Sequence, residues 1–294
     1  MSESSQRVSD NAALNGEAKL RPVSRRRTGA HAIVVRPDSN IRLADVDPAA
    51  KPPGSKRRGS KTVEELQARL AELQVALFAQ HKRSVLIVVQ AMDTGGKDGA
   101  IKVLCSGLDP NGVQLTNFKY PSAEEWDHDY LWRIHHATPR KGSIAIWNRS
   151  HYEDVLVPRV HDQITQEVWR ERCEDINNFE RMITRNGVTL IKFFLHISKE
   201  EQKARLEARL KDPTKLWKFN PGDLKERALW PAYQSAYEAV INACATDYAP
   251  WHIVPADRKW VRNVRMLQTV VDTLETMHPE YPAPEFDPET IVLE

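Results

Sequence analysis

The stretch VVQAMDTGGKDGAIK, residues 88–102, decides the fold. It starts within a continuous apolar, β-branched run at 84–90, which is typical of a buried strand in a parallel sheet. A glycine-rich turn follows, and a helical pattern starts near Lys97. A buried strand that turns directly into a helix predicts the first unit of an alternating α/β fold.

The turn approaches the phosphate-loop pattern G-x-x-x-x-G-K-[ST]. Gly96 and Lys97 match it, whereas Ala91 stands at the first glycine position and Asp98 at the Ser/Thr position. Backbone N–H groups at the start of a helix attract phosphate, and Gly95 lets the backbone approach a ligand closely. We therefore predict a phosphate-binding loop. The alternative of a plain strand-to-helix turn with a capping aspartate stays open.

Asp93 is unexpected in a loop that only holds phosphate. A carboxylate repels phosphate groups unless a cation such as Mg²⁺ lies between them. We therefore predict that Asp93 binds Mg²⁺ or orients an attacking phosphate oxygen. Lys97 supplies a positive charge for a phosphoryl group in transfer.

Similar apolar runs predict strands at 113–118, 143–147, 188–196 and 251–256. Helical patterns lie between and around them, at 62–82, 123–136, 166–183, 199–212, 223–246 and 259–277. The first of these helices is predicted to begin with a capping box of Thr62 and Glu65. The alternation predicts a three-layer α/β/α sandwich around a parallel sheet, with ligands at the carboxyl ends of the strands.

A second candidate segment is SIAIWNRSHYEDVLVPRVH, residues 143–161. Its strand ends at Asn148, where a phosphate-loop enzyme places its Walker B carboxylate, and Arg149 follows. Glu153 lies one turn further and could restore the missing negative charge, and Arg159 follows later in the segment. Alternatively, Asn148 caps the following helix and Arg149 forms a salt bridge.

Residues 205–230 form a basic segment interrupted by proline, at the place where phosphate-loop kinases carry a lid. A solvated surface hairpin is the alternative, because acidic residues are interleaved. Basic side chains outside the loop extend the set of predicted phosphate ligands. The full set is Gly95, Gly96, Lys97, Lys102, Lys119, Arg133, Arg149, Arg159, Arg209 and Lys211.

The 294-residue chain carries 42 Lys and Arg against 40 Asp and Glu, a net charge of +2, which argues against bulk binding of nucleic acid. Three widely separated cysteines indicate a reducing compartment, and no apolar run is long enough to cross a membrane. We therefore expect a cytoplasmic protein with no membrane partner. Residues 1–30 are polar and are expected to be a disordered tail.

Five segments together resemble the polyphosphate kinase 2 family: QAMDTGGKDGAIK, FKYPSAEEWDHDYLWR, IWNRSHYEDVLVPRVH, KDPTKLWKFNPGDLKERALW and APWHIVPADRKWVRN. The resemblance implies a P-loop kinase-like domain at 31–278 with a helical lid at about 205–230, followed by a tail at 279–294. It implies Mg²⁺-dependent phosphoryl transfer between inorganic polyphosphate and a nucleotide. By this likeness Asp93, Lys97, Arg149 and Glu153 are catalytic. Asp93, Asn148 and Glu153 contact the nucleotide.

Asn148 followed by Glu153 looks like the family's class III, which phosphorylates both AMP and ADP and ends at ATP. His151 stands where similar sequences more usually have tyrosine. Two other functions are kept open: an ATP-dependent nucleotide kinase of the same fold, and a non-catalytic polyanion-binding module. The Leu-rich helix at 62–82 also favours a homo-oligomer, a dimer or a tetramer.

Overall fold

The computed structural model describes residues 31–293, so the predicted tail at 1–30 lies outside the described residues. Six strands form one sheet in the order β1-β6-β5-β2-β4-β3. Their bounds are β1 (Ile33–Val35), β2 (Ser84–Ala91), β3 (Val113–Asn117), β4 (Ile144–Asn148), β5 (Val188–His196) and β6 (Trp251–Pro255).

The five longer strands run parallel, as predicted, and β2 lies at the centre between β5 and β4. The carboxyl end of β2 therefore opens in the middle of the sheet edge where ligands bind. Strand β1 was not predicted. It pairs antiparallel with β6 at the sheet's edge, and its apolar run is only three residues long, with only one of the three buried.

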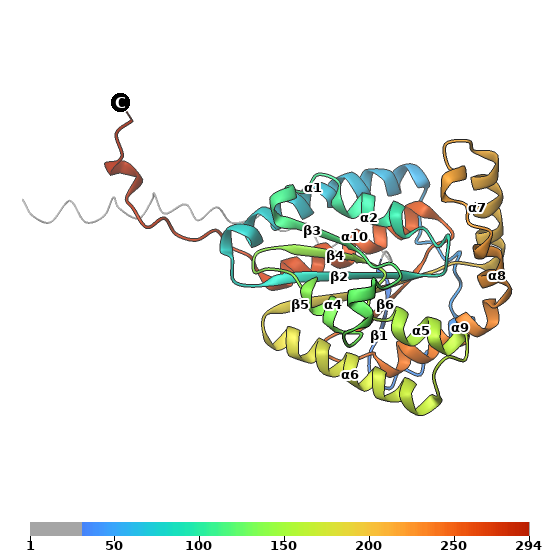
Figure 1. Ribbon diagram of the computed structural model, residues 1–294. Helices are drawn as coiled ribbons and strands as arrows, with labels where there is room; N and C mark the ends of the chain where they lie inside the picture. Colours follow the sequence, from blue (N-terminus) through green and yellow to red (C-terminus); the bar gives the residue numbers. More distant parts are fainter. Residues whose placement is uncertain (1–30, 294) are drawn as a thin grey trace, which may run out of the picture.

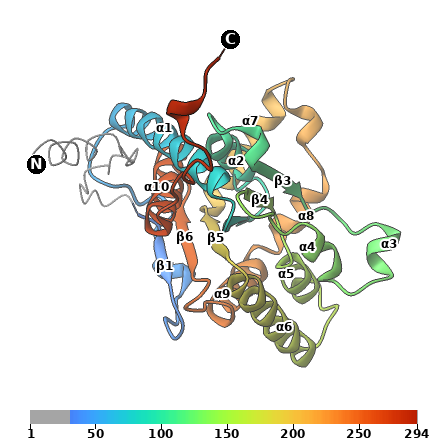
Figure 2. The ribbon, with the colours of Figure 1, turned by 90° about the vertical axis from the view of Figure 1, so that its left-hand side faces the viewer.

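Helices cover both faces of the sheet, which confirms the three-layer α/β/α architecture (Figures 1 and 2). Val85, Ile87 and Val89 of β2 pack into one apolar cluster, and Leu86 and Val88 into the other. The first cluster lies under α1 (Lys56–Gln80), α2 (Lys97–Cys105) and α10 (Lys259–Met277). The second lies under α4 (Trp132–His136), α5 (Glu153–Val160), α6 (Gln166–Arg185) and α9 (Trp230–Ala243).

The predicted start of the first helix is wrong. Helix α1 begins at Lys56, and its N-cap is Ser55, whose hydroxyl accepts a hydrogen bond from the Arg58 amide. Thr62 lies inside the helix and donates to the Arg58 carbonyl at 3.1 Å, so it forms no capping box with Glu65. The Lys/Arg run after two prolines looks like a linker, but Ser55 supplies the cap that starts a helix there.

Two other predicted helices are each divided in two. The segment at 123–136 consists of α3 (Ala123–Trp126) and α4, separated by turns. The segment at 223–246 consists of α8 (Gly222–Ala228) and α9. A proline follows the first residue of α9, and because proline has no N–H to donate, a new helix starts more easily there than the old one continues.

Helices α7 (Lys199–Lys211) and α8 form a hairpin that projects beyond the carboxyl edge of the sheet (Figure 1). This hairpin contains most of the segment at about 205–230 that is predicted to be a helical lid, and it is called the lid below. Short 3₁₀ turns complete the described elements: η1 (Leu43–Asp45), η2 (Pro110–Gly112), η3 (Leu216–Lys218) and η4 (Pro288–Thr290).

Under the second helical layer lies a fully buried ionic network. The Lys192 ammonium donates to Glu180 at 2.7 Å, to the Tyr152 hydroxyl at 3.0 Å and to the Cys244 carbonyl at 2.7 Å. His151 lies 3.2 Å from the same carboxylate. Burial alone raises the pKa of Glu180, but Lys192 and His151 more than offset this and leave its pKa below the ordinary value. His151 is therefore a core residue.

Lys192→Met is expected to lower the free energy of unfolding by about 3 to 5 kcal/mol, because it leaves the Glu180 carboxylate buried without its cation. Chemical denaturation measures this value. The exposed Lys203→Met is the matched control and should change stability by less than about 0.5 kcal/mol. A loss from Lys192→Met as small as that of the control would contradict a stabilising role for the network.

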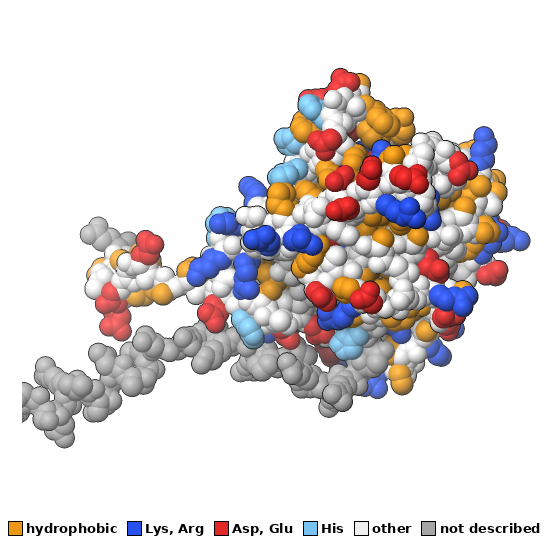
Figure 3. Space-filling model, turned by 90° about the horizontal axis from the view of Figure 1, so that it is seen from below, with side chains coloured by type: hydrophobic (Ala, Val, Ile, Leu, Met, Phe, Trp, Pro, Cys, Tyr) orange, Lys and Arg blue, Asp and Glu red, His pale blue; other side chains and the backbone are white. Residues whose placement is uncertain are grey.

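No helix within residues 31–293 is both long and apolar enough to span a membrane. On the face shown in Figure 3, Lys and Arg side chains gather on the left of the body, and both acidic and basic side chains occur over the rest. The presence of both signs of charge agrees with the near-neutral net charge of the chain.

Candidate active site

The glycine-rich loop connects the end of β2 at Ala91 to the start of α2 at Lys97. A Cβ atom on Gly95 would lie 2.5 Å from the Ala91 Cβ and 2.7 Å from the Met92 carbonyl oxygen, so only glycine fits. Gly96 is the N-cap of α2 with φ of 97°, a left-handed conformation that favours glycine. No side chain caps α2, so the alternative of a capping Asp98 is wrong.

Two arginines hold the loop from its outer side. Arg205 donates to the Gly95 carbonyl at 2.9 Å, and Arg262 donates to the Gly96 carbonyl at 2.9 Å. In a planar trans peptide the C=O and the N–H point in opposite directions, so the amides that follow these carbonyls point away from the arginines. Burial and the neighbouring Arg205 lower the pKa of Arg262 to about 10. An anion in the loop would offset this concentration of positive charge.

Lys97 folds back over its own loop. Its ammonium donates to the Ala91 carbonyl at 2.9 Å and approaches the Met92 carbonyl at 3.5 Å. Burial and the Arg149 charge lower its pKa to about 8, although Asp93 and Glu153 act in the opposite direction. A phosphate oxygen is a stronger partner for an ammonium than a neutral carbonyl, so this side chain is ready to exchange partners.

Arg149 lies directly after β4 and joins two carboxylates. Its guanidinium contacts Asp93 at 2.8 Å and Glu153 at 2.6 Å. Its backbone has φ of 64°, and its amide donates to the Val89 carbonyl of the central strand. The charges of Glu153 and Asp93 raise the pKa of Arg149, so this side chain stays positive. The predicted salt bridge of Arg149 therefore exists, and both partners are predicted site residues.

Asn148, the last residue of β4, forms hydrogen bonds with two neighbouring elements. Its side-chain amide donates to Asn117 of β3 at 2.9 Å and to Asp98 of α2 at 3.3 Å. It does not cap α5, so that alternative is wrong. The other carboxylate oxygen of Asp98 accepts a 2.9 Å hydrogen bond from Lys218 of the lid. Lys218, together with Asn148, lowers the pKa of Asp98 despite partial burial. The lid thus contacts the first turn of the phosphate-loop helix.

The structure brings Asp93, Lys97, Asn148, Arg149 and Glu153 together at the sheet edge. Other predicted phosphate ligands are engaged elsewhere. The buried Arg133 donates to the Lys119 carbonyl and pairs with Asp154 and Glu125, whereas the Arg159 guanidinium lies 4.2 Å from the Trp169 ring centre.

Four predicted cations remain on surfaces or in the lid. Lys102 is exposed on α2, and Lys119 is exposed after β3. In the lid, Arg209 donates to the Lys218 carbonyl and lies 3.5 Å from Asp223, while Lys211 is exposed.

Asp93 is the carboxylate of this site that fits a magnesium ion. Within the described part of the chain, no group of three or more His, Cys, Asp or Glu side chains could hold a metal by protein ligands alone. Mg²⁺ needs no such group, because it is commonly held by one or two carboxylates together with water and substrate phosphates. Asp93 is partly exposed beside the loop, and Arg149 engages only one of its carboxylate oxygens. Its hard oxygen donor fits a cation shared with phosphate.

This geometry defines an α/β kinase with a phosphate loop, a loop carboxylate and a basic lid. The family model described as Polyphosphate kinase 2 (PPK2) matches residues 54–282, and the chain belongs to the polyphosphate kinase 2 family. The resemblance seen in the sequence motifs is confirmed, and the chain is a phosphotransferase of this family.

Similar proteins cover most of the chain. The AMP/ADP-polyphosphate phosphotransferase of Meiothermus ruber is 47% identical over 262 residues, which are 88% of this chain and 98% of that protein. The ADP-polyphosphate phosphotransferase of Rhodopseudomonas palustris is 41% identical over 226 residues, 73% of this chain and 78% of that protein. The crystal structure of polyphosphate kinase 2 from Arthrobacter aurescens TC1 has a TM-score of 0.84 and 43% identity, covering 86% of this chain and 92% of that one.

Proposed function

We propose that the protein transfers the terminal phosphoryl group of inorganic polyphosphate to AMP and to ADP, giving ADP and then ATP, and that the reaction is reversible. The observation that carries this proposal is the pair of salt bridges that joins Asp93, Arg149 and Glu153 beside the phosphate loop. In the same loop, the Lys97 ammonium donates to loop carbonyls. The Meiothermus ruber relative, named for both AMP and ADP, supports the choice of acceptors.

In this proposal the donor's last phosphates occupy the loop. The amides after Gly95 and Gly96 bind phosphate oxygens, and Lys97 exchanges its carbonyl partners for them. Arg209 and Lys211 add positive charge when the lid closes. Lys102, Lys119, Arg133 and Arg159 stay predictions of the sequence as phosphate ligands, and the homo-oligomer stays one as well.

The acceptor lies on the Asn148 side of the loop. A terminal phosphate oxygen of the nucleotide attacks the last phosphorus of polyphosphate in line, and the bond to the bridging oxygen breaks. The electron pair leaves with the shortened chain, so no covalent enzyme intermediate is required. Arg149, held between Asp93 and Glu153, neutralises charge on the group in transfer. We assign Asp93 as the ligand of Mg²⁺, which would supply charge neutralisation between the two substrates.

Chromatography of nucleotides after incubation with polyphosphate and Mg²⁺ tests the proposal, with AMP and ADP supplied in separate reactions. ADP followed by ATP from AMP, and ATP from ADP, are the expected products. Product from ADP alone would contradict the class III assignment of Asn148 and Glu153. If ATP serves as donor in place of polyphosphate, the protein is an ATP-dependent kinase, and polyphosphate binding without turnover would indicate a binding module.

A further inference from the structure

A second positively charged cavity lies outside the phosphate loop. It is an open pocket with a volume of about 440 Å³ where the start of α1 meets the start of α10. Its lining residues are Lys51, Gly54, Ser55, Lys56, Asp257, Arg258, Lys259 and Trp260. The proposed reaction uses none of them.

Positive charge dominates this cavity. Within residues 31–293, none of the four cations Lys51, Lys56, Arg258 and Lys259 forms an ion pair. The one lining carboxylate, Asp257, is already engaged, because its two oxygens accept hydrogen bonds from the Ser198 amide at 2.8 Å and the Ser198 hydroxyl at 2.9 Å. The four cations outnumber the single carboxylate, whose oxygens are directed to Ser198, and this excess of positive charge suits a polyanionic ligand.

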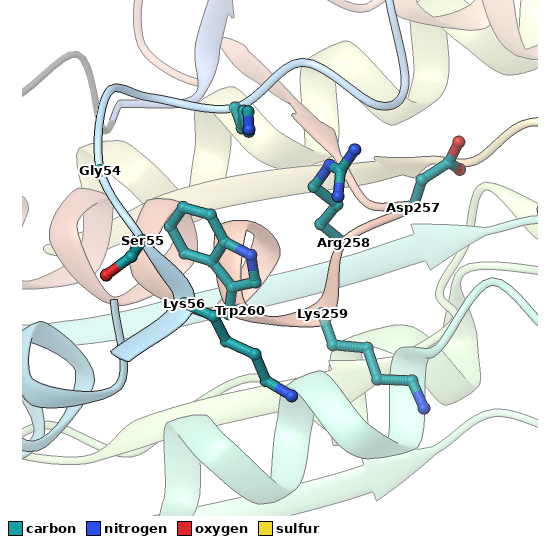
Figure 4. Close-up of a pocket in the computed structure, with 8 residues that line it drawn as sticks. Gly54, Ser55, Lys56, Asp257, Arg258, Lys259 and Trp260 are labelled. Carbon is teal, nitrogen blue, oxygen red and sulfur yellow. The ribbon is translucent and has the colours of Figure 1, made fainter. Parts of the chain in front are cut away.

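The cavity has a rigid base. The Trp260 indole packs so closely on Gly59 of α1 that a Cβ atom there would lie 2.4 Å from the ring. Figure 4 shows this indole between the start of α1 and Arg258, with the side chains of Lys56 and Lys259 extending to the same side. The contact fixes two basic helix starts relative to each other, so their charges are held together before a ligand arrives.

The cavity adjoins the phosphate loop. The Arg205 guanidinium donates at 2.9 Å to the Gly95 carbonyl in the loop and at 2.6 Å to the Ala256 carbonyl, next to the lining residue Asp257. Arg205 thus contacts both the phosphate loop and the segment after β6 that lines the cavity. Both lie at the carboxyl edge of the sheet, after β2 and β6 respectively.

We propose that this cavity binds a distal segment of the polyphosphate chain whose terminal phosphates occupy the loop. The inference rests on the proposed function. A long linear polyanion reaches both sites at once, whereas a short chain or a nucleotide fills only one. Binding at the loop then holds the distal segment at high effective concentration near Lys56 and Lys259, so the enzyme favours long chains.

The double variant Lys56→Gln/Lys259→Gln tests this assignment. Its KM for a long-chain fraction of polyphosphate is expected to rise roughly tenfold, since two exposed ion pairs are lost. Its KM for a short-chain fraction should stay within about twofold, because short chains do not reach the cavity. The matched control is Lys82→Gln/Lys141→Gln, which removes two exposed lysines at the opposite, amino edge of the sheet. Both KM values of the control should equal those of the parent protein.

Calorimetric titration of the same variants with long and short polyphosphate, without nucleotide, separates this proposal from the reaction itself. A selective loss of long-chain affinity supports the cavity even if no phosphoryl transfer is detected, in which case the proposed function alone fails. Equal losses for both lengths, or no loss for either, would overturn the cavity assignment. In separate titrations with AMP and with ADP, a loss of nucleotide affinity with unchanged polyphosphate affinity would also overturn it and assign the cavity to a nucleotide.

Discussion

Asp93→Asn is expected to lower kcat roughly a thousandfold while the protein stays folded. The substitution keeps the size of the side chain and one acceptor oxygen, but it replaces the other oxygen with an NH₂ donor and removes the negative charge that lies 2.8 Å from Arg149. Glu153 still holds Arg149 at 2.6 Å, so the arginine keeps one of its two anchors. What disappears is the loop carboxylate proposed to hold Mg²⁺ between the donor and the acceptor. Initial rates with saturating polyphosphate and AMP measure the loss.

Two further measurements separate a metal-binding role of Asp93 from a role in positioning Arg149. Loss of a metal ligand should also raise the Mg²⁺ concentration needed for half-maximal rate, whereas misplacement of Arg149 should not. Asp247→Asn is the matched control, because Asp247 is exposed and precedes β6 at the amino edge of the sheet. Activity of Asp93→Asn within about tenfold of that control, at unchanged melting temperature, would exclude Asp93 from the mechanism.

The central elements of the fold follow from sequence because their signals are local. The strand at 84–91 is apolar at nearly every position and buried on both faces, and its glycine-rich exit is visible in the same stretch. Strand β1 gives a much weaker signal, because its apolar run is only three residues long and its place in the sheet depends on pairing with β6. The start of α1 was also missed, since the Ser55 cap stands beside prolines and a run of like charges.

Some residues of the candidate site could likewise be predicted from the sequence, and others could not. Asp93, Lys97 and Arg149 each lie just after a predicted strand, and strand ends meet at one edge of a parallel sheet. Arg262 was missed because its role depends on a contact with Gly96, far away in sequence, that only the packed position of α10 creates. A similar limit applies to Arg133, whose burial against Asp154 and Glu125 depends on packing and does not show in the sequence.

Lys97→Met is expected to reduce activity roughly a thousandfold and, at neutral pH, to make the protein more stable. The functional side of this prediction is the loss of the cation that faces the phosphoryl group. The stability side follows from the Lys97 pKa, which burial and Arg149 lower from 10.5 to about 8. Keeping this lysine charged in the folded protein at pH 7 costs about 3 kcal/mol, part of which methionine removes.

The sign of the pH dependence follows from proton binding in the two states. Between pH 8 and 10.5 the unfolded chain keeps the Lys97 proton while the folded protein releases it, so stability rises with pH across this window. The melting temperature of Lys97→Met should therefore exceed that of the parent protein at pH 7, and the difference should shrink as the pH rises above 8. Lys61→Met, which removes an exposed lysine of α1, should show no such trend.

The same pKa sets the alkaline limit of activity. In the free enzyme Lys97 loses its proton above about pH 8, so kcat/KM for polyphosphate should fall there. Bound phosphate favours the charged ammonium and raises its pKa, so kcat at saturating donor should fall only at a higher pH. Two results would contradict this role of the Lys97 ammonium. One is that kcat/KM and kcat fall at the same pH. The other is that the melting temperature of Lys97→Met equals that of the parent protein at every pH.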